Sequence, residues 1–279
     1  MKKVCLITGC STGIGKSMAE KLAAEGFRVY AGVRNTASLA SLKSENFIPV
    51  KLDVNDPQQI EHTIKTIKHQ CGQLDLLINN AGFGAMGPVA EVPIEQIRNQ
   101  FSTNVFAPVA LTQAALPLLI KSNNAQVVNI GSVAGIFTIP FSGIYGASKA
   151  ALHAISDVLR MELKPFNIHV MTVYPGGVAS AFGDTATQKL QDTLVNDSLY
   201  SACIKAINNR AKISSKSSTT PDMFANTLIK ALHKNTPPKS MFIGQGSSLL
   251  KLAKTILPTA LRERMLGKSY SLNQLGQKE

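Results

Sequence analysis

Short apolar runs alternate along the chain with longer segments whose apolar residues recur every three or four positions. The runs predict strands at 3–8, 27–33, 47–52, 74–79, 125–131, 168–173 and 240–243. The segments predict helices near 14–25, 57–70, 93–120, 144–164 and 221–234. Repeated alternation of strands and helices indicates an α/β fold with a parallel sheet that helices cover on both faces.

The length and composition fit one domain that spans residues 1–279. A chain of 279 residues with 44% hydrophobic content can bury one substantial core. The longest apolar stretch, 105–120, is interrupted by two prolines and two polar residues and is shorter than a typical bilayer span. We expect it to form a buried helix or a helix at a subunit interface.

A glycine-rich turn follows the first predicted strand. The sequence at 8–15 contains Thr8, Gly9, Gly13 and Gly15, and a helical pattern begins directly after it. Backbone N–H groups and the positive end of a helix can hold a pyrophosphate at such a turn. The alternative is that the glycines serve only to pack the strand against the helix.

Tyr145 and Lys149 are four residues apart on a predicted helix, which places a phenol and an ammonium one turn apart on one face. A free tyrosine has a pKa of about 10, and a nearby positive charge favours its phenolate. Alone, such a pair is more often a solvated surface. Two further features favour a catalytic role for this pair: Ser132 follows an apolar strand, and residues 79–82 end another.

Across residues 2–245 the sequence resembles the short-chain dehydrogenase/reductase family. The matching motifs are the glycine turn at 8–15, Asp53 on the adenine side, the central motif at 80–82, and Pro175 with Gly176 beside the nicotinamide. The resemblance implies a single-domain, Rossmann-like, doubly wound parallel sheet. It also implies a catalytic tetrad of Asn104, Ser132, Tyr145 and Lys149. The cofactor contacts that it implies are Gly9, Ser11, Gly13, Ile14, Gly15, Arg34, Asp53, Val54, Asn80, Ala81, Gly82, Tyr145, Lys149, Pro175, Gly176, Val178 and Ser180.

The family also implies a role for each member of the tetrad. Tyr145 exchanges a proton with the substrate oxygen while the nicotinamide exchanges a hydride. Ser132 hydrogen-bonds the reacting oxygen, and Lys149 contacts the nicotinamide ribose and lowers the pKa of Tyr145. Asn104 holds a water through which protons reach Lys149. We expect His153, on the same helix, to be structural.

The end of the second predicted strand favours NADP(H) over NAD(H). NAD-preferring members usually place an acid there, whereas this chain has Val33 followed by Arg34. A guanidinium suits a 2′-phosphate in charge and in geometry. Thr12 stands in the glycine loop where many NADP-using relatives carry a basic residue, and Arg34 could instead be a solvated loop cation.

The substrate side is apolar. Apolar residues follow the central motif and lie between Ser132 and Tyr145, and residues 179–219 form a long insertion that we interpret as a substrate lid. The segment 28–35 and the extended C-terminal region resemble the hydroxysteroid and retinol dehydrogenase-like branch. This resemblance implies a steroid, a retinoid or a long-chain aldehyde as substrate.

The C-terminal part is strongly basic. Residues 201–279 contain 13 Lys/Arg and 3 Asp/Glu, of 29 and 17 in the whole chain. Within an extension at 247–279, an apolar helical stripe leaves Lys251 and Lys254 outside it; the stripe comprises Leu249, Leu252, Ala253, Ile256 and Leu257. Such a segment can dock peripherally on an anionic membrane. It can equally pack over the substrate pocket or on a partner subunit.

Other classes of function have little support in the sequence. No nucleic-acid-binding module accompanies the basic charge, and the four cysteines show no metal-like spacing. The N-terminus runs directly into a strand, so we expect a cytoplasmic protein without a cleavable leader. We expect a homodimer or homotetramer. An NADP(H)-dependent oxidoreductase of lipophilic alcohols or carbonyls is the leading hypothesis; the alternatives are a 3-oxoacyl-carrier reductase and a non-catalytic dinucleotide-sensing protein.

Overall fold

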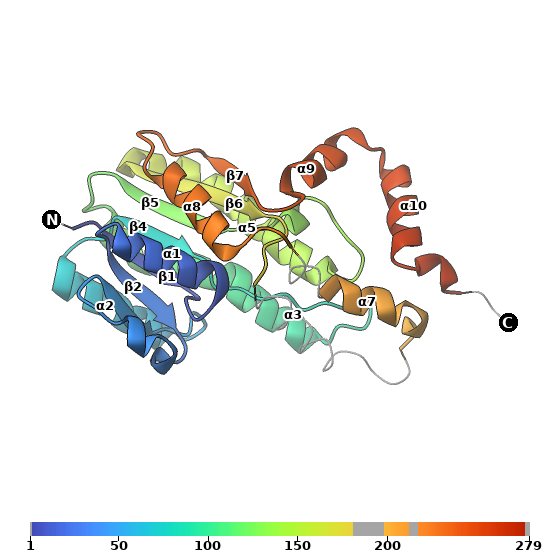
Figure 1. The fold of residues 1–279 in the computed structure, drawn as a ribbon, viewed down its shortest axis with the longest axis horizontal. Coiled ribbons are helices and arrows are strands. Elements are labelled where there is room, and N and C mark those ends of the chain that lie inside the picture. Colours follow the sequence, from blue (N-terminus) through green and yellow to red (C-terminus); the bar gives the residue numbers. More distant parts are fainter. Residues whose placement is uncertain (1, 181–197, 212–216, 277–279) are drawn as a thin grey trace.

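The computed structural model describes residues 2–180, 198–211 and 217–276 (Figure 1). In this part of the chain, seven strands form one sheet in the order β3-β2-β1-β4-β5-β6-β7, and all neighbouring strands are parallel. The predicted sheet is therefore confirmed, with all strands close to their expected positions. They are β1 (Val4–Thr8), β2 (Arg28–Val33), β3 (Phe47–Lys51), β4 (Leu76–Asn79), β5 (Ala125–Ile130), β6 (Ile168–Pro175) and β7 (Ser240–Ile243).

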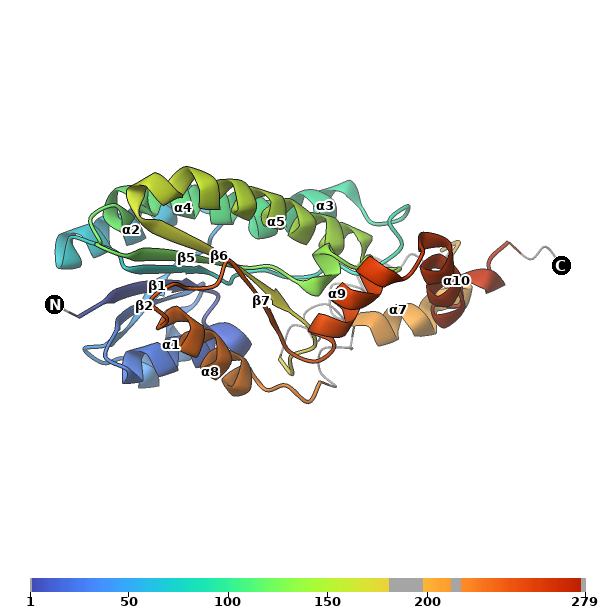
Figure 2. The same cartoon turned by 90° about the horizontal axis from the view of Figure 1, so that it is seen from above.

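Helices cover both faces of the sheet, as predicted. Figure 2 shows α1 and α8 on one face and α2, α4 and α5 on the other, with α7, α9 and α10 beyond one end of the sheet. The helices in the described residues are α1 (Gly13–Ala24), α2 (Pro57–Cys71), α3 (Ile94–Phe101), α4 (Ala107–Leu119), α5 (Gly143–Leu163), α7 (Ile204–Ala211), α8 (Pro221–Leu232), α9 (Ser247–Ile256) and α10 (Thr259–Ser269). Within these residues no helix is long and apolar enough to cross a bilayer.

Local sequence sets the ends of the helices that flank the sheet. Asp56 caps α2 by accepting hydrogen bonds from two backbone N–H groups of the first turn, and Pro57 occupies the first helical position. Gly72 ends α2 with a φ of 75°, a left-handed conformation that glycine adopts without strain. Thr220 caps α8, where its hydroxyl accepts a hydrogen bond from the backbone N–H of Met223. These signals explain why both helices begin close to where the periodicity predicts.

The single helix predicted at 93–120 is wrong in one respect. The structure contains α3, a π-helical turn at Ser102–Phe106, and then α4. In a regular α-helix the carbonyl of Asn104 would accept from the backbone N–H of residue 108, but Pro108 has none. The ladder of hydrogen bonds is thus interrupted where a candidate catalytic residue lies. π-helical turns are frequently found at functional sites.

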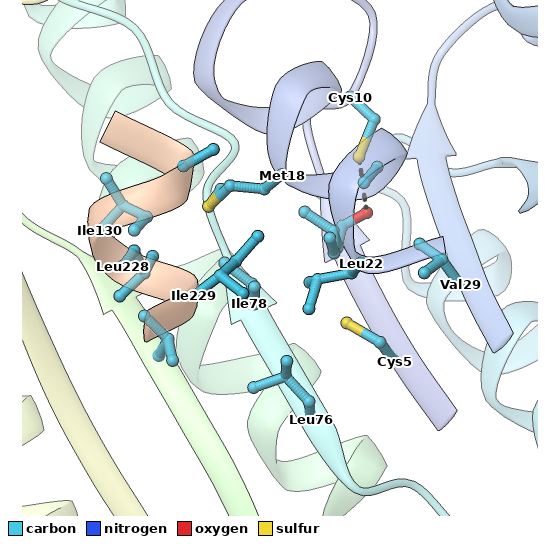
Figure 3. Close-up of a cluster of buried hydrophobic side chains, with 14 of the residues drawn as sticks. Cys5, Cys10, Met18, Leu22, Val29, Leu76, Ile78, Ile130, Leu228 and Ile229 are labelled. Carbon is cyan, nitrogen blue, oxygen red and sulfur yellow. Dashed lines mark hydrogen bonds between the residues drawn. The ribbon is translucent and has the colours of Figure 1, made fainter. Parts of the chain in front are cut away.

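Two apolar layers hold the helices to the sheet. Figure 3 shows part of the layer on the α1 and α8 side, where Met18 and Leu22 of α1 meet Leu228 and Ile229 of α8. Cys5 also lies in this layer and is fully buried. All four cysteines of the chain are free thiols. Burial raises the pKa of the Cys5 thiol, so this residue acts as an inert core side chain.

The topology indicates at which edge of the sheet a ligand would bind. The chain order reverses between β1 and β4, and ligands of such sheets bind beyond the carboxyl ends of the strands at this point. The glycine turn, the central motif and Ser132 all follow strands that end there. The sheet therefore gathers the candidate residues, which are far apart in the sequence, at one edge.

Candidate active site

Hydrogen bonds join the glycine turn to the end of β4. The hydroxyl of Thr8 accepts from the backbone N–H groups of Asn80 and Ala81 at 3.0 and 2.9 Å. The side-chain amide of Asn80 donates to the carbonyls of Thr8 and Gly9 at 2.8 and 3.1 Å. The two motifs are thus one rigid unit. Asn80 and Ala81 are brought to the turn as predicted.

The turn leaves the start of α1 open to a ligand. The side chain of Thr12, the residue before the helix, makes no capping hydrogen bond, so the first N–H groups of α1 remain available for an anion. Gly13 has a φ of 59°, which favours glycine. At Gly15 a Cβ atom would lie 2.2 Å from the carbonyl oxygen of Gly9, so only glycine lets the turn approach the helix. Ser11 is exposed and Ile14 half-buried at the same edge.

The predicted adenine-side residues lie at the ends of β2 and β3. Val33 is buried, and Arg34 directly after it is exposed. Asp53 is half-buried; its side chain accepts from the backbone N–H of Asn55 at 3.0 Å, which orders the loop. Val54 is buried beside it. An exposed cation thus directly follows the buried end of β2, with no acid at Val33.

Ser132 and Tyr145 meet at the carboxyl end of β5. Both side chains are buried and joined by a hydrogen bond. Burial raises the pKa of Tyr145, and the bond from Ser132 and the positive charge of Arg210 oppose that rise. The sequence assigned the lowering of this pKa to Lys149. In the structure the two influences that oppose the rise are the bond from Ser132 and the charge of Arg210, and a contribution from Lys149 stays a prediction.

Lys149 lies deeper in the site, one turn along α5. Its ammonium donates to the carbonyl of Ile130 at 2.8 Å, and 4% of the residue is exposed. Burial lowers the pKa of Lys149 from 10.5 to about 8. Gly82 provides the opposite wall, since a Cβ there would lie 3.4 Å from the Lys149 Nζ and 3.0 Å from the Oδ1 of Asn104. The ammonium, the amide and the central motif therefore share one small space.

Asn104 is fully buried on the π-helical turn. Its amide nitrogen donates to the carbonyl of Phe83 at 2.9 Å and to the hydroxyl of Ser148 at 3.0 Å. Its amide oxygen accepts from the backbone N–H of Phe83 at 3.2 Å. Asn104 thus ties the loop after β4 to α5. All four predicted catalytic residues are brought together.

His153 supports this group, in keeping with the structural role that the sequence predicts for it. Its Nε2 accepts from the backbone N–H of Ser132 at 3.2 Å, so the imidazole holds the loop that carries the Ser132 hydroxyl. Burial and the nearby charge of Lys149 lower the pKa of His153 to about 4, which keeps the ring neutral. The spacing of one turn from Lys149 was the available signal. His153 therefore positions Ser132 and acts neither as a ligand nor as an acid or base.

The segment after β6 leads to the glycine turn. Gly176 has no room for a side chain, because a Cβ would lie 2.3 Å from the carbonyl of Gln245. Val178 is buried. Ser180 lies across from the glycine turn, where a Cβ on Gly13 would come within 3.2 Å of the Ser180 Cβ. Pro175 ends β6, and all four predicted residues of this segment thus lie beside the turn or lead to it.

An apolar cluster covers the outer side of Tyr145. It contains Met86 and Phe141 from the loops, Ile207 from α7, and Leu272 from the C-terminal region. The predicted substrate lid at 179–219 includes residues 181–197 and 212–216, which lie outside the described part of the chain. Within the described residues, the cluster makes an apolar wall next to the tetrad.

The apolar stripe of the C-terminal extension is only partly covered by the described residues, since Ala253 and Leu257 are half-buried and its other three residues are exposed. Leu249, Leu252 and Ile256 of α9 are 69%, 54% and 65% exposed. Further along the extension, Tyr270 and Leu272 join the cluster around Tyr145. The apolar periodicity of the sequence could not show which residues of the extension contact the cluster around Tyr145.

Comparisons with known proteins agree with this geometry. Residues 3–191 match the family described as short chain dehydrogenase. The chain is 30% identical to the NADPH-dependent 1-acyldihydroxyacetone phosphate reductase of Saccharomyces cerevisiae, with 98% of this chain and 93% of that protein covered. It is 34% identical to the short-chain dehydrogenase cctT of Talaromyces islandicus, with 99% and 98% covered.

Solved structures have the same architecture. A short-chain dehydrogenase from Streptomyces avermitilis matches with a TM-score of 0.79 and 25% identity over 98% of this chain and 99% of that one. Two less similar structures share the fold: one from Burkholderia cenocepacia in complex with NADP (TM-score 0.74, 24% identity, 95% and 98% covered) and one from Burkholderia phymatum in complex with NAD (0.77, 22%, 100% and 97%). The chain therefore belongs to the short-chain dehydrogenase/reductase family of nicotinamide-dependent oxidoreductases.

Proposed function

We propose that the chain is an NADP(H)-dependent oxidoreductase that transfers a hydride between the cofactor and the carbonyl or alcohol carbon of a lipophilic substrate. The observation that carries the proposal is the burial of Ser132, Tyr145 and Lys149 together at the carboxyl end of β5. A protein that only senses a dinucleotide needs no such acid–base set. The apolar wall beside Tyr145 supports the lipophilic substrate.

The residues present fit a bound dinucleotide. The uncapped first turn of α1, with Gly13 at its start, suits a pyrophosphate. Lys149 and Asn80 to Gly82 line the place where the nicotinamide ribose would lie. Ser180, which stands near Gly13, can hydrogen-bond the nicotinamide amide through its hydroxyl.

Each catalytic side chain has a definite task in this proposal. The bound nicotinamide supplies or accepts the hydride. In reduction, Tyr145 donates the proton of its hydroxyl to the substrate oxygen, and in oxidation it removes that proton. Ser132 orients the same oxygen by a hydrogen bond. Lys149, with its lowered pKa near 8, can exchange protons close to neutral pH, and Asn104 fixes the loop beside it.

Arg34 supports the preference for NADP(H). The side chain is exposed at the end of β2, and among the described residues no carboxylate lies within ion-pair distance of it. A 2′-phosphate would give this guanidinium a bidentate partner. The yeast relative is named as NADPH-dependent, which agrees with this preference.

The substrate class within the proposal is a steroid, a retinoid or a long-chain aldehyde, as the resemblance to the hydroxysteroid and retinol dehydrogenase-like branch implies. The exposed apolar stripe of α9, bordered by Lys251 and Lys254, supports peripheral contact with an anionic membrane surface in which such substrates dissolve. A homodimer or homotetramer is part of the same proposal.

A spectrophotometric screen tests the proposed function. Ketones, aldehydes and alcohols of increasing apolar size are offered with each dinucleotide, and absorbance of the reduced cofactor is followed in the wild type and in Tyr145→Phe. We expect turnover with NADP(H), increasing efficiency with apolar size, and loss of turnover in the variant. Cofactor binding without turnover of any carbonyl or alcohol would favour the sensing protein, and selective turnover of carrier-bound substrates would favour the 3-oxoacyl-carrier reductase.

A further inference from the structure

A buried arginine stands in the apolar wall of the site. Arg210 lies on the last turn of α7 and is 8% exposed. One turn earlier, Ile207 packs in the cluster that covers Tyr145. A guanidinium is an unexpected group in the wall of a pocket for a neutral, lipophilic substrate, because desolvating an ion costs several kcal/mol (on the order of 5) unless a partner compensates it.

The described contacts of Arg210 use little of its hydrogen-bonding capacity. Its Nε donates to the hydroxyl of Ser142 at 3.3 Å, and that hydroxyl itself donates to the carbonyl of Ile139 at 3.0 Å. The Nε–H is one of about five N–H donors of a guanidinium, and the others lie on the two terminal nitrogens. Ser142 immediately precedes α5, so this bond directs the guanidinium toward the helix that carries Tyr145.

The charge of Arg210 faces the reacting group. Its positive charge acts on the pKa of Tyr145 and on that of Tyr270, lowering both against the effect of burial. Among residues 2–180, 198–211 and 217–276, no carboxylate lies within ion-pair distance of the guanidinium. Arginine remains protonated in proteins, so this part of the pocket is positive.

We infer that Arg210 binds an anionic group of the substrate, a carboxylate or a phosphate, next to the carbonyl that is reduced at Tyr145. The substrate is then an acidic ketone with a long apolar remainder, which lies against the half-buried Tyr200, Tyr270 and Leu272 of the same cluster. A guanidinium suits both anions because its planar fork can donate two parallel hydrogen bonds to either. This inference rests on the proposed function and narrows its substrate class from neutral lipids to amphiphilic anions.

Matched substrate pairs test the inference. One pair is a long-chain γ-oxo acid and its methyl ester; the other is a long-chain hydroxyketone phosphate and the free hydroxyketone. Steady-state reduction with NADPH is measured in the wild type, in Arg210→Gln and in Arg264→Gln, which removes an exposed charge from α10. Thermal unfolding and NADPH titration confirm that each variant folds and binds cofactor.

We expect the wild type to prefer one anionic substrate over its neutral partner. Arg210→Gln should raise KM for that anion by about 30-fold or more, the effect of removing one partner of a buried charge pair, while KM for the neutral partner changes by less than about threefold. Because the charge of Arg210 also opposes the rise of the Tyr145 pKa, kcat should fall to the same extent for both partners, and the ratio of the two KM values is the readout. Arg264→Gln should behave as the wild type. The pair that shows the larger effect distinguishes a carboxylate from a phosphate.

Three results would overturn the inference. The first is a wild type that reduces neutral ketones without any preference for the anions. The second is an equal change in KM for charged and neutral substrates in Arg210→Gln with a shifted pH–rate profile, since Arg210 would then act only through Tyr145. The third applies if Arg210→Gln does not fold. Arg210→Asn or Arg210→Met, whichever folds, then takes its place, and Arg210→Lys, which keeps the charge, is the comparison. A wild-type ratio of neutral to anionic KM in the uncharged variant would exclude anion binding by Arg210.

The proposed function can fail separately. If the wild type reduces none of the four ketones, the oxidoreductase activity on such substrates is refuted. Calorimetric titration of the hydroxyketone phosphate and the γ-oxo acid into the NADP-loaded wild type and Arg210→Gln then still decides the inference. Binding that depends on Arg210 supports it, and binding that is absent or independent of Arg210 overturns it.

Discussion

Replacing Lys149 by methionine should stabilise the cofactor-free protein while it damages the proposed site. Burial lowers the pKa of Lys149 from 10.5 to about 8, and this difference corresponds to about 3 kcal/mol of destabilisation when the folded state carries the charge. Methionine has a similar length without the charge, but it cannot donate to the carbonyl of Ile130, which costs about 1 kcal/mol. The expected net gain near neutral pH is therefore about 2 kcal/mol in the free energy of unfolding.

The stability difference between wild type and Lys149→Met should depend on pH in a definite direction. Below about pH 8 both the folded and the unfolded wild type carry the Lys149 charge, so the full cost of burying it is present. Between about pH 8 and 10.5 the folded protein releases the proton that the unfolded chain still binds, so the stability of the wild type rises with pH. The advantage of Lys149→Met should therefore shrink over this interval.

Urea unfolding of wild type and variant without cofactor, at pH 7 and at a pH near 10, measures this difference. Lys230→Met, at an exposed position of α8, serves as the control and should change the stability by less than about 0.5 kcal/mol. Lys149→Met should also lose turnover and bind NADPH more weakly. A variant that is less stable than the wild type at pH 7, or an advantage that stays constant with pH, would refute the reasoning.

Four further predictions test other parts of the site. Tyr145→Phe keeps the ring but removes the proton, so turnover should fall by about 10²–10⁴-fold with NADPH affinity retained, and near-normal turnover would exclude the assigned role. Arg34→Ala should weaken NADP(H) binding by about 1.5–3 kcal/mol and leave NAD(H) nearly unchanged in calorimetric titration; an equal loss for both cofactors would contradict the assignment. His153→Leu leaves the buried N–H of Ser132 without its acceptor, so denaturant unfolding should show a loss of about 1–3 kcal/mol, and unchanged stability would show that another group accepts that bond. Leu249→Gln combined with Leu252→Gln should abolish salt-sensitive sedimentation with anionic vesicles and preserve NADPH binding; a wild type that ignores such vesicles at low salt would leave subunit packing as the role of the stripe.

Motifs carried by the local chain were predictable because their chemistry depends on short-range spacing. The glycine turn at 8–15 follows a strand and opens a helix. Tyr145 and Lys149 are one helical turn apart, and this spacing does not depend on the rest of the chain. The parallel sheet was predictable for a similar reason, since the alternation of strands and helices leaves few other arrangements. The π-helical turn at Asn104 was missed because apolar periodicity does not reveal where a proline removes a backbone donor.

The sequence by itself determined the order of the elements, the carboxyl ends at which the candidate residues lie, and the types of group proposed to do the chemistry, because these depend on local spacing and side-chain identity. Only the tertiary structure decided what surrounds those groups. Lys149 has its pKa near 8 because the fold buries it against the carbonyl of Ile130, and the charge beside Tyr145 comes from Arg210, more than sixty residues away in the chain. Burial and long-range proximity set the electrostatic energy of a group, and neither is written in the spacing of the residues around it.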